Sequence, residues 1–163
     1  NSFDIRHASH DFLGTLYSKV IYDDMGPDTI DYYYYTGEGS VNVTEVVVDN
    51  GREQKSYDSM YFEEYLTQKD QYSSFLGSNQ PVVTVKTDSP SGKKLLVIKD
   101  SYAHSLVPFL SNHYSEITMV DLRYINTSLD EKVPLDEYDQ VLFVYNVENF
   151  TEDQNLPKLE LTK

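Results

Sequence analysis

The segment LLVIKDSYAHSLVPFL (Leu95–Leu110) changes character at its centre. Its first four residues form a continuous apolar run, which is typical of a strand covered on both faces of a parallel sheet. Residues 102–112 have the spacing of a helix, with Pro108 bending or restarting it. Asp100 and Ser101 lie at the junction. The segment therefore predicts a strand, a turn and a helix, with an Asp-Ser pair where the strand ends.

Further strands are predicted on both sides of this segment. EITMVDL (Glu116–Leu122) and DQVLFVYN (Asp139–Asn146) follow it, so the second half alternates strands with helical or polar connections. That alternation favours an α/β fold with a parallel sheet. In the first half, the run VNVTEVVV (Val41–Val48) is followed by Asp49-Asn50-Gly51. Asn and Gly tolerate positive φ, so this pattern predicts a β-hairpin.

Polar residues follow three predicted strands. Asp100 and Ser101 end the first, Asp121 and Arg123 the second, and Asn146 the third. If the strands are parallel, these residues open onto one edge of the sheet, where ligands of such folds bind. Arg123 and Asp121 either clamp a ligand or form an internal ion pair, and Asn146 either donates to an oxyanion or bonds its own loop.

Ser101 has two interpretations. Its hydroxyl is placed as a nucleophile, with the N–H groups of the following helix available to an oxyanion. Serine is also a favoured residue at the start of a helix. A nucleophilic serine needs a general base. The chain has four histidines, and the sequence places none of them convincingly as the base of Ser101. His104 lies on the same predicted helix as Ser101, and His113 lies near the end of that helix. His7 and His10 lie in an N-terminal stretch that looks unstructured.

Composition excludes several classes of function. The net charge of −14 disfavours binding to nucleic acids. The chain lacks cysteine, which excludes disulfides and thiolate metal sites, and its apolar runs are shorter than the roughly 18 residues of a membrane span. Asp136, Glu137 and Asp139 lack the spacing of a calcium loop. We expect no metal and no cofactor.

The longest informative block resembles a known family. KKLLVIKDSYAHSLVPFLSNHYSEITMVDLRYIN (Lys93–Asn126), with YDQVLFVYN (Tyr138–Asn146) and DFLGTLYSK (residues 11–19), resembles the DHHW family of bacterial exported proteins. The resemblance implies an SGNH-hydrolase-like relative of the alginate O-acetyltransferases. The implied fold is a three-layer α/β/α, flavodoxin-like domain with a mostly parallel sheet and a β-hairpin inserted in the first half. Ser101 falls on the nucleophile position, and Lys99 replaces the glycine of the usual Gly-Asp-Ser block.

The resemblance also implies a function. We expect an esterase or O-acetyltransferase domain acting on a cell-envelope glycan outside the cytoplasm. Candidate catalytic residues are Ser101, Asp100 and Asn146, and candidate substrate-binding residues are Tyr102, His104, Asp121 and Arg123. The chain has neither Trp nor an Asp-His-His-Trp motif, so its acid–base pair is missing and its activity stays open. We expect residues 1–163 to be one domain, the C-terminal part of a longer SGNH-like protein, with 1–10 and 151–163 peripheral. The alternative is a non-catalytic surface or glycan-binding domain that retains the fold.

Overall fold

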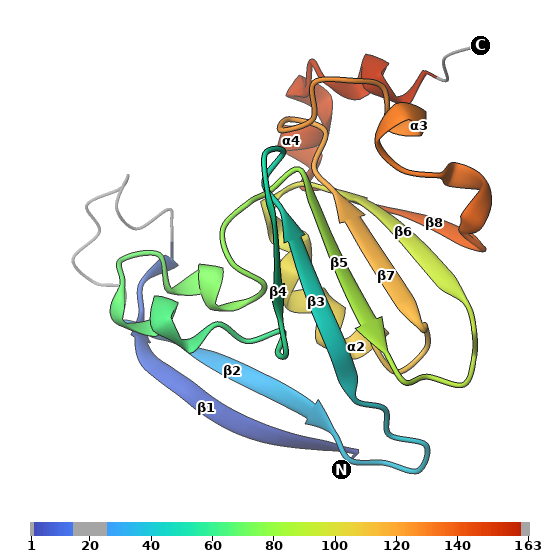
Figure 1. Ribbon diagram of the computed structural model, residues 1–163. Helices are drawn as coiled ribbons and strands as arrows, with labels where there is room; N and C mark the ends of the chain where they lie inside the picture. The colour runs from blue at the N-terminus through green and yellow to red at the C-terminus, as the bar shows by residue number, and fades with distance from the viewer. Residues whose placement is uncertain (1, 15–25, 161–163) are drawn as a thin grey trace. The chain divides into compact units, whose positions relative to one another are not determined.

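The computed structural model describes residues 2–14 and 26–160 (Figure 1). These residues form two compact units. The first takes its residues from Asn1–Ser40 and Tyr61–Ser78, and the second from Val41–Met60 and Asn79–Lys163. The candidate site lies in the second unit.

The first unit is built on a two-stranded antiparallel sheet. It pairs β1 (Phe3–Phe12) with β2 (Asp28–Tyr35), and the 3-10 helices η1 (Glu63–Thr67) and η2 (Gln71–Ser74) complete the unit. The sequence did not predict β1, because His7 and His10 seemed to lie in an unstructured start. Tyr32 is fully buried and stacks on Tyr61 with ring centroids 4.1 Å apart. One tyrosine of this tyrosine-rich strand thus contributes to the core, together with Ile30, whereas Tyr34 is exposed.

The second unit contains a six-stranded sheet. Its strands are β3 (Val43–Asp49), β4 (Gln54–Tyr57), β5 (Val82–Thr87), β6 (Lys94–Lys99), β7 (Glu116–Val120) and β8 (Gln140–Val144). Their spatial order is β4-β3-β5-β7-β6-β8. The predicted parallel arrangement of the last three strands is confirmed, since β6 pairs in parallel with both β7 and β8.

The predicted fold class is wrong. The expected three-layer α/β/α domain with a mostly parallel sheet is replaced by a mixed sheet, in which β3 pairs antiparallel with β4 and β5, and β5 pairs antiparallel with β7. A parallel connection needs a crossover of a dozen or more residues. The connection between β5 and β6 spans only residues 88–93, so β6 runs back against the direction of β5. Strand β7 then inserts between them.

The predicted hairpin is confirmed. Strands β3 and β4 pair antiparallel around Asn50-Gly51. Asp49 Oδ1 accepts a hydrogen bond from the Gly51 N–H at 2.7 Å, and Gly51 has φ of +87°, a conformation that glycine adopts without strain.

Helices in the described part of the second unit are short. They are η3 (Ser101–Leu106), α2 (Val107–Leu110), α3 (Leu129–Lys132), η4 (Leu135–Glu137), α4 (Val147–Glu152) and η5 (Leu156–Leu159). Such short segments do not form the continuous helical layers of the predicted fold. Leu129 of α3 belongs to a buried cluster that includes Leu96 and Ile98, and Leu156 and Leu159 pack against this cluster. Within residues 2–14 and 26–160, no helix is long and apolar enough to cross a membrane.

Candidate functional site

Ser101 lies where the sequence placed it. Strand β6 ends at Lys99, Asp100 is the N-cap, and Ser101 is the first, partly exposed residue of η3. The helix continues into α2, with Pro108 in its first turn. The capping role belongs to Asp100, whose Oδ1 accepts a hydrogen bond from the Tyr102 N–H at 2.9 Å. The hydroxyl of Ser101 is therefore not used to cap the helix.

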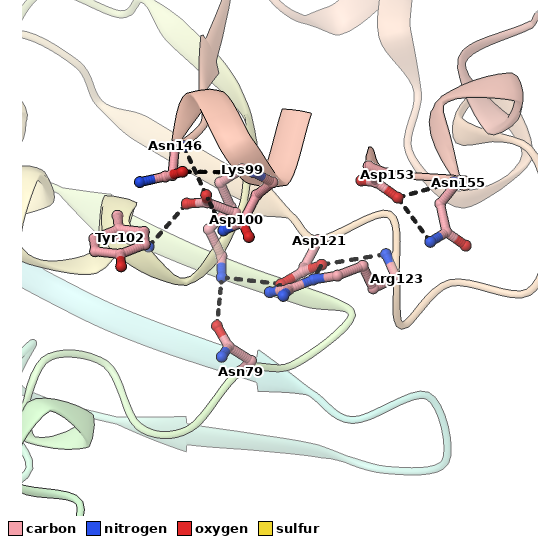
Figure 2. Close-up of polar contacts among 10 residues, drawn as sticks. Asn79, Lys99, Asp100, Tyr102, Asp121, Arg123, Asn146, Asp153 and Asn155 are labelled. Carbon is pink, nitrogen blue, oxygen red and sulfur yellow. Dashed lines mark hydrogen bonds and ion pairs between the residues drawn. The ribbon is translucent and has the colours of Figure 1, made fainter. Parts of the chain in front are cut away.

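Asp100 ties this turn to the end of the neighbouring strand. Its side chain is 1% exposed, and its Oδ2 accepts hydrogen bonds from the Asn146 N–H at 2.7 Å and from Asn149 Nδ2 at 2.8 Å. Figure 2 shows this carboxylate between Tyr102 and Asn146. With three donors already bonded, Asp100 holds the backbone on both sides of Ser101 in place.

Asn146 caps the next helix. Its Oδ1 accepts hydrogen bonds from the backbone N–H groups of Glu148 at 2.9 Å and Asn149 at 3.5 Å, at the start of α4. The loop-bonding interpretation of this residue is therefore the one that the structure shows. An oxyanion-donor role would fall to its Nδ2 group and stays a prediction.

A buried ion network lies beneath the turn. Lys99 and Asp121 are both fully buried, with Lys99 Nζ 3.6 Å from Asp121 Oδ2 and 3.1 Å from Asn79 Oδ1, to which it donates a hydrogen bond. Asp121 also accepts hydrogen bonds from Arg123 Nε at 2.9 Å and Nη2 at 2.6 Å (Figure 2). The internal ion pair between Asp121 and Arg123 is thus present.

Burial changes the acid–base behaviour of this network. It lowers the pKa of Lys99 to about 8, although the negative charge of Asp121 opposes the shift. Sequence reasoning missed Lys99 and Asn79 as members of the network. The available signal was a lysine directly after four apolar residues of a buried strand, since a lysine there needs a carboxylate partner.

A pocket of about 320 Å³ opens beside the Asp100 carboxylate. The residues that line it come from the ends of β6, β7 and β8 and from the α4 region, and they include Asp100, Arg123, Tyr145, Asn149, Asp153 and Asn155. Of the predicted substrate-binding residues, the pocket includes Arg123. Asp121 is not one of the lining residues, but it forms an ion pair with Arg123, which is. Ser101 is not one of the lining residues either, but it follows Asp100, which lines the pocket.

The remaining predicted site residues lie on η3. The side chain of Tyr102 is 53% exposed, whereas His104 is 2% exposed inside the unit. Neither is among the residues that line the pocket. His113 is exposed after α2, and His7 belongs to the first unit, where its Nδ1 lies 2.8 Å from Asp31 Oδ1. The structure brings Asp100, Asn146, Asp121 and Arg123 to one edge of the sheet and buries His104.

Comparisons with known proteins identify the fold. Neither the protein-family models nor the curated proteins matched the sequence. Among solved structures, a DHHW family protein from Eubacterium siraeum superposes with a TM-score of 0.81 and 23% identity, over 99% of this chain and 54% of that chain. The chain shares its fold with a DHHW family protein.

Two further structures are similar. PatB1 from Bacillus cereus with a sulfonyl adduct has a TM-score of 0.71 and 21% identity, over 95% of this chain and 50% of that chain. A second structure of PatB1 has a TM-score of 0.66 and 20% identity, over 94% and 52% of the two chains. The present chain spans about half the length of each of these proteins.

Proposed function

We propose that this chain is the serine-bearing part of an SGNH-like esterase or O-acetyltransferase that acts on a cell-envelope glycan outside the cytoplasm. The observation that carries the proposal is the position of Ser101. It lies two residues after the end of β6, an interior strand with parallel neighbours on both sides, and it is partly exposed. The helix that it begins is capped by Asp100. The likeness in fold to a DHHW family protein supports the proposal.

The proposed chemistry is acyl transfer through Ser101. Its Oγ would form a bond to the acyl carbon of an ester while the bond between that carbon and the sugar oxygen breaks. The proton of Ser101 would pass to a base and then to the departing oxygen. In the similar structure of PatB1, a sulfonyl adduct is present. Sulfonyl groups attach to activated nucleophiles, and an activated Ser101 would react with them in the same way.

Within the described residues of the second unit, the base of this proposal stays unassigned. His104, three residues from Ser101, is buried within η3. In the family that the sequence resembles, an Asp-His-His-Trp motif would supply the acid–base pair. We propose that such a pair lies in further polypeptide of the same protein, because the solved structures of this fold are about twice as long as this chain.

The burial of His104 favours a second candidate function. A chain that retains the fold and its pocket without a reachable base would bind a glycan without cleaving an ester. Reading the gene upstream of Asn1 for an Asp-His-His-Trp motif separates the two candidates at once.

The decisive experiment is covalent labelling of the whole gene product. We expect phenylmethanesulfonyl fluoride to add one sulfonyl group to Ser101, detected by mass spectrometry, and to abolish acetyl-ester hydrolysis. Ser101→Ala should remove both the label and the activity, whereas Ser105→Ala, a serine on the same helix, should retain both. Full activity in the Ser101→Ala variant would overturn the assignment of the nucleophile.

A further inference from the structure

The turn between β3 and β4 contains a pair of residues that can react with each other. Asn50 is the only asparagine of the sequence that precedes a glycine, and both Asn50 and Gly51 are exposed to water. The backbone nitrogen after an asparagine can attack the Cγ atom of that asparagine, because the ring that closes has only five members. A side chain on the attacking residue hinders this approach, and glycine has none.

Asp49 places a base on the attacking nitrogen. The Gly51 N–H donates a hydrogen bond to Asp49 Oδ1 at 2.7 Å, within the range of about 2.6–3.2 Å over which a general base takes a proton. A carbonyl oxygen in this position would hold the N–H without taking its proton, whereas a carboxylate oxygen can take it. The hydrogen bond that shapes the turn therefore also prepares the Gly51 nitrogen for attack.

Two backbone N–H groups meet the oxygen that gains charge in this attack. Asn50 Oδ1 accepts hydrogen bonds from the N–H of Arg52 at 2.9 Å and from the N–H of Glu53 at 3.0 Å. Attack on Cγ turns this carbonyl oxygen into an oxyanion, and N–H donors at about 2.7–3.1 Å stabilise such a charge. The turn thus supplies an oxyanion site for the Asn50 side chain as well as a base for the Gly51 nitrogen.

A tertiary contact holds the base in place. Asp49 Oδ2 accepts hydrogen bonds from Lys132 Nζ of α3 at 3.2 Å and from Gln54 Nε2 at 3.4 Å, and the side chains of Asp49 and Lys132 are both partly buried. These bonds fix the carboxylate with Oδ1 on the Gly51 N–H. A peptide with the sequence of the hairpin lacks Lys132 and loses this positioning, which is a large part of the rate of reactions between fixed groups.

We propose that Asn50 is a site of self-modification, at which the folded protein converts this asparagine into aspartate or isoaspartate. A bond forms between Gly51 N and Asn50 Cγ, and the bond between Cγ and Nδ2 breaks. The proton of the Gly51 N–H passes by way of Asp49 to the Nδ2 nitrogen, which departs as ammonia. Water then opens the cyclic imide at either of its two carbonyl groups. Ser101 takes no part, so this reaction goes beyond the proposed function.

The products change the turn that forms them. Both add a negative charge between Asp49 and Glu53, and like charges so close together repel each other. Isoaspartate also lengthens the backbone of the turn by one carbon atom. Strand β4 has four residues and lies at the edge of the sheet, so its register depends on this turn. The modification therefore loosens the pairing of β4 with β3.

The test compares the folded protein with a synthetic peptide of residues 44–55. Both are incubated at neutral pH and body temperature, and the conversion of Asn50 is followed by mass spectrometry of the fragment that contains it. We expect Asn50 to react at least about threefold faster in the folded protein, because only the folded protein holds Asp49 through Lys132. An equal or slower reaction in the folded protein would overturn the inference.

Three variants separate the base from its support. Asp49→Ala should slow the reaction at least about tenfold, the low end of what a general base contributes. Lys132→Met keeps the carboxylate but frees it, and should slow the reaction at least about threefold. Lys55→Met removes a lysine that pairs with Glu53 in the same hairpin, and should leave the rate unchanged.

These variants also decide against the inference if it is wrong. A wild-type rate in Asp49→Ala would show that this carboxylate is not the base. If Asp49→Ala melts well below the wild type, the comparison of Lys132→Met with Lys55→Met decides, because both keep Asp49 and remove one positive charge. Equal rates in these two lysine variants would overturn the inference.

Discussion

The carboxylate of Asp100 accepts a hydrogen bond from the backbone N–H of Asn146 at 2.7 Å, which fastens the residue before Ser101 to the end of the neighbouring strand β8. The same carboxylate caps η3 through the Tyr102 N–H. One buried side chain thus sets the backbone on both sides of the candidate nucleophile. The sequence suggested Asp100 as a catalytic residue, and the structure shows it bonded to the two segments that form the site.

Replacing this carboxylate should destabilise the second unit. Asp100→Asn places an amide N–H group against donors that now bond a carboxylate oxygen, and we expect a loss of about 3 kcal/mol in the free energy of unfolding. Urea denaturation measures the change. The exposed Asp136→Asn serves as the control and should change stability by less than about 0.5 kcal/mol. Equal effects of the two substitutions would contradict the role given to Asp100.

Lys99 should make stability depend on pH in the alkaline range. Its pKa is about 8 in the folded protein, against an ordinary value of 10.5. Below about pH 8 both states hold the proton, and burial of the charge lowers stability. Between about pH 8 and pH 10.5, the folded protein loses the proton of Lys99 while the unfolded chain keeps it. The free energy of unfolding therefore rises with pH in this range.

Lys99→Met removes this titration and provides the comparison. From pH 7 to about pH 9.5, we expect the wild type to gain about 2 kcal/mol relative to Lys99→Met, measured by urea denaturation at both values. Asp121 keeps its pairing with Arg123 in the variant, which limits other effects of the substitution. A difference between the two proteins that stays the same at both pH values would show that Lys99 does not titrate in this range.

The hairpin between β3 and β4 should depend on Gly51. With φ of +87°, this position favours glycine, and Gly51→Ala should lower the free energy of unfolding by about 1 kcal/mol. Thermal denaturation measures the effect. Gly26→Ala is the control, because an added Cβ there meets nothing within 4 Å and its φ is not positive. If both variants melt at the temperature of the wild type, the turn conformation is not the constraint.

The 163-residue chain by itself should be a poor esterase. Ser101 has no histidine base that the sequence or the described residues place against it, and loss of the base costs several orders of magnitude in rate. We expect hydrolysis of an acetyl ester to be at least about a thousandfold slower than in a polypeptide that also carries an Asp-His pair. Equal rates would show that a histidine of this chain is the base, and His104→Ala would then be the first variant to assay.

Local sequence was sufficient for the elements that carry the candidate site. The apolar run Leu95–Ile98 followed by Asp100 and Ser101 predicted a strand, a turn and a helix, and β6 and η3 lie there. The Asn50-Gly51 pair predicted the hairpin between β3 and β4, because Asn and Gly tolerate positive φ. Apolar runs, helix caps and turns with positive φ depend on residues that are close together in the sequence. They can therefore be predicted without knowing how the rest of the chain folds.

Only the tertiary structure decided the direction of β5, the insertion of β7 between β5 and β6, and the pairing of β1 with β2. It also decided that Lys99 meets Asp121 and Asn79, and that Arg123, Tyr145 and Asp153 line one pocket. These contacts join residues far apart in the chain. They depend on which strands become neighbours, and strand order follows from packing the whole core rather than from the spacing of side chains within one segment.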